Sequence, residues 1–144
     1  MRCPTMAPAK PRVLVAGTEL AIATCKRLLD EDAQIIAARS VPEALEHLES
    51  APDLVVSSVR FDESRMFDFL QQLGSRCRAP VLCCRMVDKP LTATMYQSIE
   101  TAARALGVTA FFDMDTEIRV HGEAQAERRL RSLILAHLPV RAVT

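Results

Sequence analysis

The sequence predicts an α/β domain: a doubly wound, five-stranded parallel sheet in the order 2-1-3-4-5, arranged as a three-layer sandwich. One observation and one topological rule support this class. Five short apolar, strand-like runs alternate along the chain with longer segments whose apolar residues recur at helical spacing. Parallel strands joined by right-handed crossovers place helices on both faces of one sheet, and strand order 2-1-3-4-5 is a common version of that arrangement.

The first half of the chain predicts three strands and two helices. We expect strands at 12–16, 34–37 and 54–59. The segment 19–29 predicts a helix, because Ala21, Cys25 and Leu28 lie at helical spacing. Ser40 is an N-cap residue and Glu43 follows three positions later, which is a capping box for a helix over 41–50.

The second half predicts two further strands and three helices. Ser64 caps a third helix that ends at Gly74, and a strand follows at 80–84. A long amphipathic helix over 92–106 is closed by Gly107. The last strand lies at 108–112 and the last helix at 123–138.

Length and composition are those of one globular domain. The chain has 144 residues, 49% hydrophobic and 25% charged, and its 18 basic residues balance 18 acidic ones. We expect a flexible tail at 1–11, one domain at 12–138 and a second tail at 139–144. The balanced charge gives no indication of nucleic-acid binding, and no apolar run approaches the roughly 20 residues that cross a bilayer. The N-terminus has no apolar segment typical of a secretory signal, so we expect a cytoplasmic protein.

The cysteines do not form a metal-binding pattern. No C-x-x-C pair or Cys/His cluster has ligand spacing, so we predict no metal site and reduced thiols that pack as small hydrophobic side chains. Adjacent residues of a strand point to opposite faces, so Cys83 and Cys84 are expected to be two buried thiols. A thiol-based switch is a weaker alternative, which requires an exposed and acidic cysteine. The five residues are Cys3, Cys25, Cys77, Cys83 and Cys84.

Residues 11–138 resemble the receiver domain of two-component response regulators, a flavodoxin-like fold. The stretch PDLVVSSV at 52–59 is similar to the third-strand motif of that family, and places Ser58 at the position of the phosphoacceptor aspartate. The stretch RVLVAGTE at 12–19 is similar to the first strand, with Gly17 and Thr18 where the family has its Mg²⁺-binding acids.

The last two strands continue this resemblance. PVLCCR at 80–85 is similar to the fourth strand, with Arg85 in place of the family's hydroxyl residue. GVTAFFDMD at 107–115 is similar to the fifth, with Phe111 at the aromatic switch position and Met114 in place of the lysine. A shifted alignment does not restore that lysine, because the only lysines are Lys10, Lys26 and Lys89.

These replacements predict a receiver pocket that cannot carry out aspartyl phosphorylation. Aspartyl phosphorylation needs a carboxylate nucleophile, acidic Mg²⁺ ligands, and Lys and Ser/Thr groups that stabilise the phosphoryl oxygens. The Ser58 hydroxyl has no nearby base and is a poor substitute. We therefore expect no catalytic residue, no cofactor and no enzymatic activity.

Two interpretations remain open for the arginines near the carboxyl edge of the sheet. Arg60 and Arg85 could form an anion or nucleotide site, since ligands of α/β folds bind at this edge. Alternatively, arginine–carboxylate pairs replace the lost Mg²⁺ and lysine network and hold the loops, which is the commoner role of such arginines. The candidate acidic partners are Asp62, Glu63, Asp113 and Asp115.

The leading functional hypothesis is a pseudo-receiver, a phosphorylation-independent module of signal transduction that acts by protein–protein contact. The resemblance implies homodimerisation or docking to a signalling or regulatory protein through the fourth- and fifth-helix side, with Phe111 a fixed packing residue. The segments on either side of the fifth strand are longer than is usual in the family, by a turn or more each. The alternative is a small-molecule sensor that binds a nucleotide or another anion at the carboxyl edge.

Overall fold

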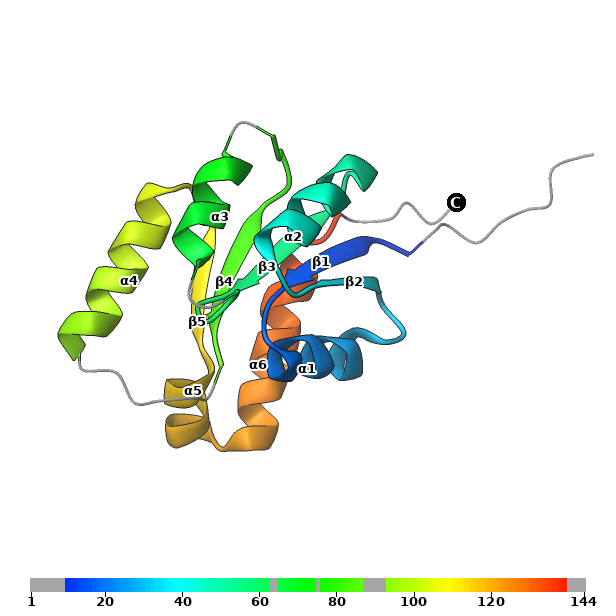
Figure 1. Cartoon of the computed structure of the whole chain (residues 1–144). Helices are drawn as coiled ribbons and strands as arrows, with labels where there is room; N and C mark the ends of the chain where they lie inside the picture. The colour runs from blue at the N-terminus through cyan, green and yellow to red at the C-terminus, as the bar shows by residue number, and fades with distance from the viewer. Residues whose placement is uncertain (1–9, 63–64, 75, 87–92, 140–144) are drawn as a thin grey trace, which may run out of the picture.

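The chain forms one five-stranded parallel sheet in the order β2-β1-β3-β4-β5 (Figure 1). The computed structural model describes residues 10–62, 65–74, 76–86 and 93–139. The predicted fold class and strand order are confirmed. The strands are β1 (Arg12–Ala16), β2 (Gln34–Ala38), β3 (Leu54–Ser58), β4 (Val81–Arg85) and β5 (Ala110–Asp113).

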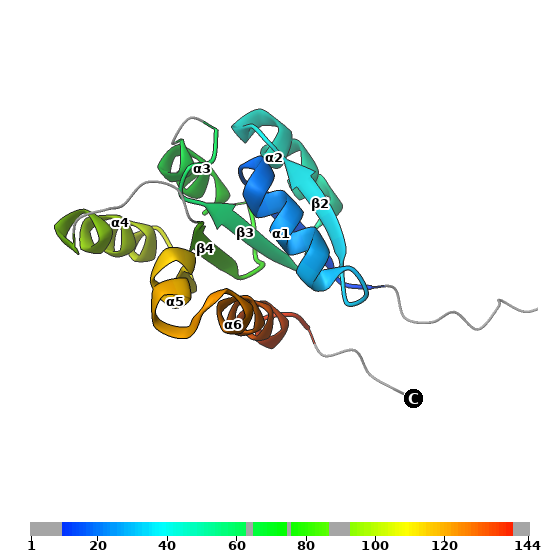
Figure 2. The ribbon, with the colours of Figure 1, turned by 90° about the horizontal axis from the view of Figure 1, so that it is seen from below.

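Helices cover both faces of the sheet (Figures 1 and 2). The helices are α1 (Glu19–Leu29), α2 (Val41–His47), which continues into the 3-10 turn η1 (Leu48–Ser50), α3 (Met66–Leu73), α4 (Ala93–Ala105), α5 (Met114–His121) and α6 (Glu123–Ala136). Residues of α1 and α6 share one hydrophobic core with alternate residues of the strands. The opposite core contains residues of α2, α3 and α4. Both faces of each central strand are therefore buried, as a doubly wound sheet requires.

Local sequence signals set several helix ends, and those at Ser40 and Gly107 agree with the prediction, whereas the Thr18 cap was not predicted. Thr18 caps α1, where its hydroxyl accepts a hydrogen bond from the Ala21 N–H at 3.3 Å. Ser40 caps α2 by accepting from the Glu43 N–H at 3.2 Å. Gly107 follows α4 with a φ of 97°, a left-handed conformation that favours glycine.

Other boundaries differ from the prediction. In the structure, β3 ends at Ser58 and α6 ends at Ala136, both earlier than expected. Strand β5 begins at Ala110, two residues later than expected. The largest difference is α5, an extra helix that the sequence analysis did not predict. It lies beyond the carboxyl ends of β4 and β5, between α4 and α6 (Figures 1 and 2). The predicted cap Ser64 and the predicted helix start Thr92 lie outside the described residues.

The predicted tails lie mostly outside the residues that the structure describes. Pro11, which we placed at the end of the N-terminal tail, is buried, and its carbonyl accepts a hydrogen bond from the Gln34 N–H at 2.9 Å. Lys10 donates to the Asp30 carbonyl at 3.2 Å. None of the helices in the described ranges combines the length and the apolar character needed to span a membrane.

Candidate functional site

The carboxyl ends of β1 and β3 meet at the position where the resemblance places the phosphoacceptor pocket. Gly17 follows β1, and a side chain at this position would put its Cβ 3.0 Å from the Cβ atoms of Ala21 and Ser58. Such a distance is well inside ordinary van der Waals contact, so the neighbours would have to move. Ser58 is 2% exposed. The structure therefore brings Gly17 and Ser58 together in direct packing, which any side chain at residue 17 would disturb.

The hydroxyl groups at this edge bond to the local backbone. Thr18, the second position where the family has an acid, caps α1. The Ser58 hydroxyl accepts a hydrogen bond from the Arg60 N–H at 3.3 Å. These contacts stabilise the helix start and the turn after β3, and they supply no base beside Ser58.

The ends of β4 and β5 are joined by a buried ion pair. Arg85 and Asp113 are the last residues of these strands and are cross-strand partners in the register. The Nη1 atom of Arg85 lies 2.6 Å from Oδ1 of Asp113, and each side chain is only 6% exposed. A charge-assisted hydrogen bond in such a buried place is short and strong, and each group compensates the other's loss of solvent.

Asp113 also caps the extra helix. Its Oδ1 accepts from the Asp115 N–H at 3.1 Å and from the Thr116 N–H, and its Oδ2 accepts from the Thr116 hydroxyl at 2.8 Å. Asp115 adds a second carboxylate, 3.5 Å from Arg85 and 3.3 Å from Arg119. Through this network, the guanidinium on β4 fixes the start of α5 against the carboxyl edge of the sheet.

Arg60 and Arg85 have different surroundings at this edge of the sheet. Arg85 lines a depression of about 550 Å³ beside α4 and α5 that does not include Arg60, which is exposed in the turn after β3. Asp62 accepts a hydrogen bond from the Val41 N–H at 2.8 Å, and Glu63 lies outside the described residues. For Arg85, the geometry favours the interpretation in which carboxylate pairs hold the edge together.

Met114 and Phe111 belong to opposite faces of the sheet. Met114, at the family's lysine position, is 4% exposed and packs in the core beneath α1 and α6. Phe111 is half-buried on the α4 side, where its ring makes an edge-to-face contact with Tyr96 at 5.4 Å between centroids. Burial, and next the nearby Glu100 carboxylate, raise the pKa of Tyr96. The aromatic switch position thus packs against a neutral phenol rather than open space.

Burial disfavours the thiolate form of three cysteines. Burial raises the pKa of the Cys25 and Cys83 thiols to about 12, and it raises that of Cys84 well above its ordinary value. Cys77 is half-buried, and Cys3 lies outside the described residues. Over the described ranges, no three His, Cys, Asp or Glu side chains are grouped so as to hold a metal ion.

The capping role of Asp113, and with it helix α5, was not predicted from the sequence. The signal was present in the stretch DMDTEIRVHG at 113–122. An Asp cap precedes acidic residues in the first turn and basic residues in the last turn, and Gly122 follows with a φ of 85°.

Solved structures with the same architecture include response-regulator receiver domains. No protein-family model matches the chain, and no match was found among curated proteins. The response regulator domain of Thermotoga maritima CheB aligns with a TM-score of 0.68 and 19% identity, over 92% of this chain and 99% of that one. Vibrio cholerae chemotaxis protein CheY4 aligns with a TM-score of 0.66 and 18% identity, over 90% of this chain and all of the other.

A third structure supports the same assignment. The BeF3-activated receiver domain of Klebsiella pneumoniae RstA aligns with a TM-score of 0.64 and 14% identity, over 91% of this chain and 100% of the other. The chain therefore has the fold of a response-regulator receiver domain, along nearly the full length of each of these domains. At these identities the likeness concerns the fold, and the function has to be argued from the residues of the site.

Replacing Gly17 with alanine is expected to destabilise the protein. The added Cβ meets Ala21 and Ser58 at 3.0 Å, so Gly17→Ala should lower the free energy of unfolding by about 1–3 kcal/mol. The matched control is Gly74→Ala, where φ is −49° and the nearest heavy atom is 3.5 Å away. That variant should be neutral or more stable by about 0.4–1 kcal/mol. Urea denaturation measures both, and equal stabilities would contradict the close packing of Gly17 on Ser58.

Removing one charge of the Arg85–Asp113 pair should be more harmful than removing both. Asp113→Asn keeps a capping side chain on α5 but leaves the buried guanidinium without its main counter-charge. We expect a loss of about 3–5 kcal/mol in the free energy of unfolding. The double variant Arg85→Met, Asp113→Asn should recover part of that loss. Denaturant unfolding of Asp113→Asn, Arg85→Met and the double variant provides the test, and strict additivity would show that the pair is not coupled.

Thiol labelling of the native protein should follow burial and pKa. Cys25, Cys83 and Cys84 remain protonated and shielded at neutral pH, so iodoacetamide should modify them only after unfolding. Cys77 should react earlier. Peptide mapping by mass spectrometry, with and without urea, reads out each site. Rapid native labelling of Cys83 or Cys84 would contradict this assignment and favour the thiol-switch alternative.

Proposed function

We propose that this protein is a receiver-like signalling or regulatory module that acts through protein–protein contact without phosphorylation. The observation that carries this proposal is the buried Arg85–Asp113 pair, which lies where the resemblance places the groups that read a phosphoryl oxygen. A guanidinium already satisfied by a carboxylate at 2.6 Å has its charge compensated, and it is not available to an incoming anion.

The other pocket positions support the same proposal. Acyl-phosphate formation needs a carboxylate that attacks phosphorus, and Mg²⁺ to hold the leaving and transferred groups. At those positions this chain has Ser58 and the Gly17–Thr18 pair, with Gly17 packed on Ser58 and Thr18 engaged as a helix cap. No enzymatic step, cofactor or metal ion is part of the proposed function.

The partner surface that we propose is the side formed by α4, β5 and α6. The partner is a protein, either a second copy of this chain or another signalling or regulatory protein, and the module acts in the cytoplasm. Supporting this surface, β5 is an edge strand of the sheet, and Phe111 lies on it half-buried against Tyr96. A fixed aromatic contact is suited to a permanent docking surface rather than to one that changes with phosphorylation.

A second candidate is a sensor of small anions, and the depression beside Arg85 is the observation that favours it. Arg119 lines it together with Arg85, and the Arg119 side chain is 71% exposed. However, Asp113 and Glu100 line the same space, so the local charge is mixed rather than basic. A thermal-shift screen with nucleotides and inorganic phosphate tests this candidate, because a ligand of the native state raises the melting temperature.

The proposed function predicts no response to a phosphoryl analogue. Solution mass by light scattering and the amide NMR spectrum should be unchanged by Mg²⁺ with beryllofluoride, and acetyl phosphate should leave no acid-stable or acyl-phosphate label. A receiver domain that retains its aspartate serves as the positive control under the same conditions. A change in mass or spectrum, or a label on Ser58 or any aspartate, would overturn the proposal.

A further inference from the structure

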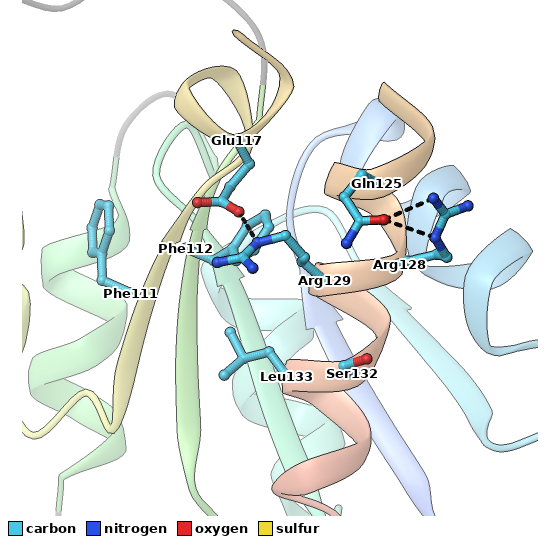
Figure 3. Close-up of a pocket in the computed structure, with 8 residues that line it drawn as sticks. All are labelled: Phe111, Phe112, Glu117, Gln125, Arg128, Arg129, Ser132 and Leu133. Atoms are coloured by element: carbon cyan, nitrogen blue, oxygen red, sulfur yellow. Dashed lines mark hydrogen bonds and ion pairs between the residues drawn. The ribbon is translucent and has the colours of Figure 1, made fainter. Parts of the chain in front are cut away.

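An open groove runs between the edge strand β5 and helix α6 (Figure 3). Its volume is about 770 Å³. Phe112 lies behind Arg129 on the floor, while the Phe111 side chain points away from α6, so that residue contributes mainly its backbone side (Figure 3). Gln125, Arg128 and Arg129 of α6 also line it, and Glu117 of α5 closes one end. Arg129 points toward β5, whereas the Arg128 side chain lies with Gln125 on the flank of α6 that faces away from β5 (Figure 3).

The floor of this groove is an unpaired strand edge. Within the described part of the chain, β5 pairs only with β4. The Thr109 N–H donates to the Val81 carbonyl at 2.8 Å, so residue 109 directs its main-chain groups toward β4. Because those groups alternate along a strand, Ala110 and Phe112 direct their N–H and C=O groups away from β4, to the unpaired edge. Ala110 is half-buried, and Phe112, behind Arg129, is 8% exposed. Such groups are a template for one more strand.

The wall of the groove carries an uncompensated positive charge. Arg129 forms an ion pair with Glu117, but Arg128 donates both of its hydrogen bonds, at 3.0 and 2.7 Å, to the Oε1 atom of Gln125. An amide oxygen is neutral, and no carboxylate of the described residues pairs with Arg128. Other arginines of α6 differ: Arg131, for example, is paired with Asp32. A carboxylate would be a stronger acceptor for the Arg128 guanidinium than Gln125 is.

We propose that this groove binds an extended, acidic segment of a partner protein, which adds to β5 as a further strand and places a carboxylate on Arg128. The open edge supplies main-chain hydrogen bonds, and the wall of α6 selects for negative charge. This inference rests on the proposed function, since it specifies the chemistry of the protein partner. It assigns Arg128 as the residue that determines specificity.

The probe is a synthetic peptide of alternating valine and glutamate, acetyl-Val-Glu-Val-Glu-Val-Glu-amide, titrated into the ¹⁵N-labelled full chain. As an added strand, this peptide directs all its carboxylates to one face. The expected result is saturable shifts of the amide signals of Ala110 and Phe112. A peptide with glutamine in place of glutamate should bind about tenfold more weakly, a ratio of the size expected for one charge-assisted hydrogen bond. No saturable shift at these two amides would overturn the proposal.

The Arg128→Gln variant should weaken binding of the glutamate peptide about tenfold and abolish its preference over the glutamine peptide. The matched control is Arg76→Gln, which removes another exposed arginine outside the groove. Neither side chain is buried, so both variants should fold. Equal weakening by the two variants would show that only overall charge matters, which would overturn the assignment of Arg128.

N-methylated peptides test the added strand itself. Methylating the valine nitrogens blocks one edge of the peptide, and methylating the glutamate nitrogens blocks the other. One of these peptides should lose binding and the other should keep it. Equal binding by both contradicts strand addition. Shifts of Ala110 and Phe112 that follow protein concentration without peptide would make a second copy the occupant. A beryllofluoride response would refute phosphorylation independence but leave these results standing, so the two failures are distinguishable.

Discussion

The buried pair of Arg85 and Asp113 is the interaction on which the carboxyl edge of this molecule depends. Two charges that are 6% exposed lose most of their hydration, and an ion pair compensates that loss only when its remaining hydrogen-bonding groups are also satisfied. Asp113 meets this condition, because it accepts hydrogen bonds from Arg85, from two backbone N–H groups and from the Thr116 hydroxyl. One carboxylate thus joins β4, β5 and the first turn of α5.

The position of α5 follows from this carboxylate, and the surface around β5 follows from α5. The helix begins where Asp113 caps it and ends at Gly122, whose positive φ turns the chain into α6. Glu117 of α5 then reaches Arg129 of α6, which closes one end of the groove beside the edge strand. The buried Asp113 therefore determines the shape of the exposed groove beside β5.

Much of the fold could be predicted because its determinants are local. The spacing of Ala21 and Cys25, the Ser40–Glu43 cap and Gly107 each act within a few residues, and the alternation of strands and helices then restricts the topology. The geometry of the site is not local. The Arg85–Asp113 pair joins residues 28 positions apart, and the close packing of Gly17 on Ser58 depends on how two strands end. The resemblance predicted which positions are replaced, but the contacts that their side chains make could not be predicted from the sequence.

The α5 helix shows why such a site is difficult to predict from the sequence. Of its eight residues, Met114 is the one that is buried in the core. A short helix with so little burial gains little from packing and depends on its cap and on the charges at its ends. The cap is Asp113, and the buried position of Asp113 is tolerable because Arg85 lies opposite it. The Arg85–Asp113 pair has no net charge and holds α5 in place, whereas a phosphorylatable receiver pocket binds and releases ions. This difference is the physical basis for proposing a module with one fixed state.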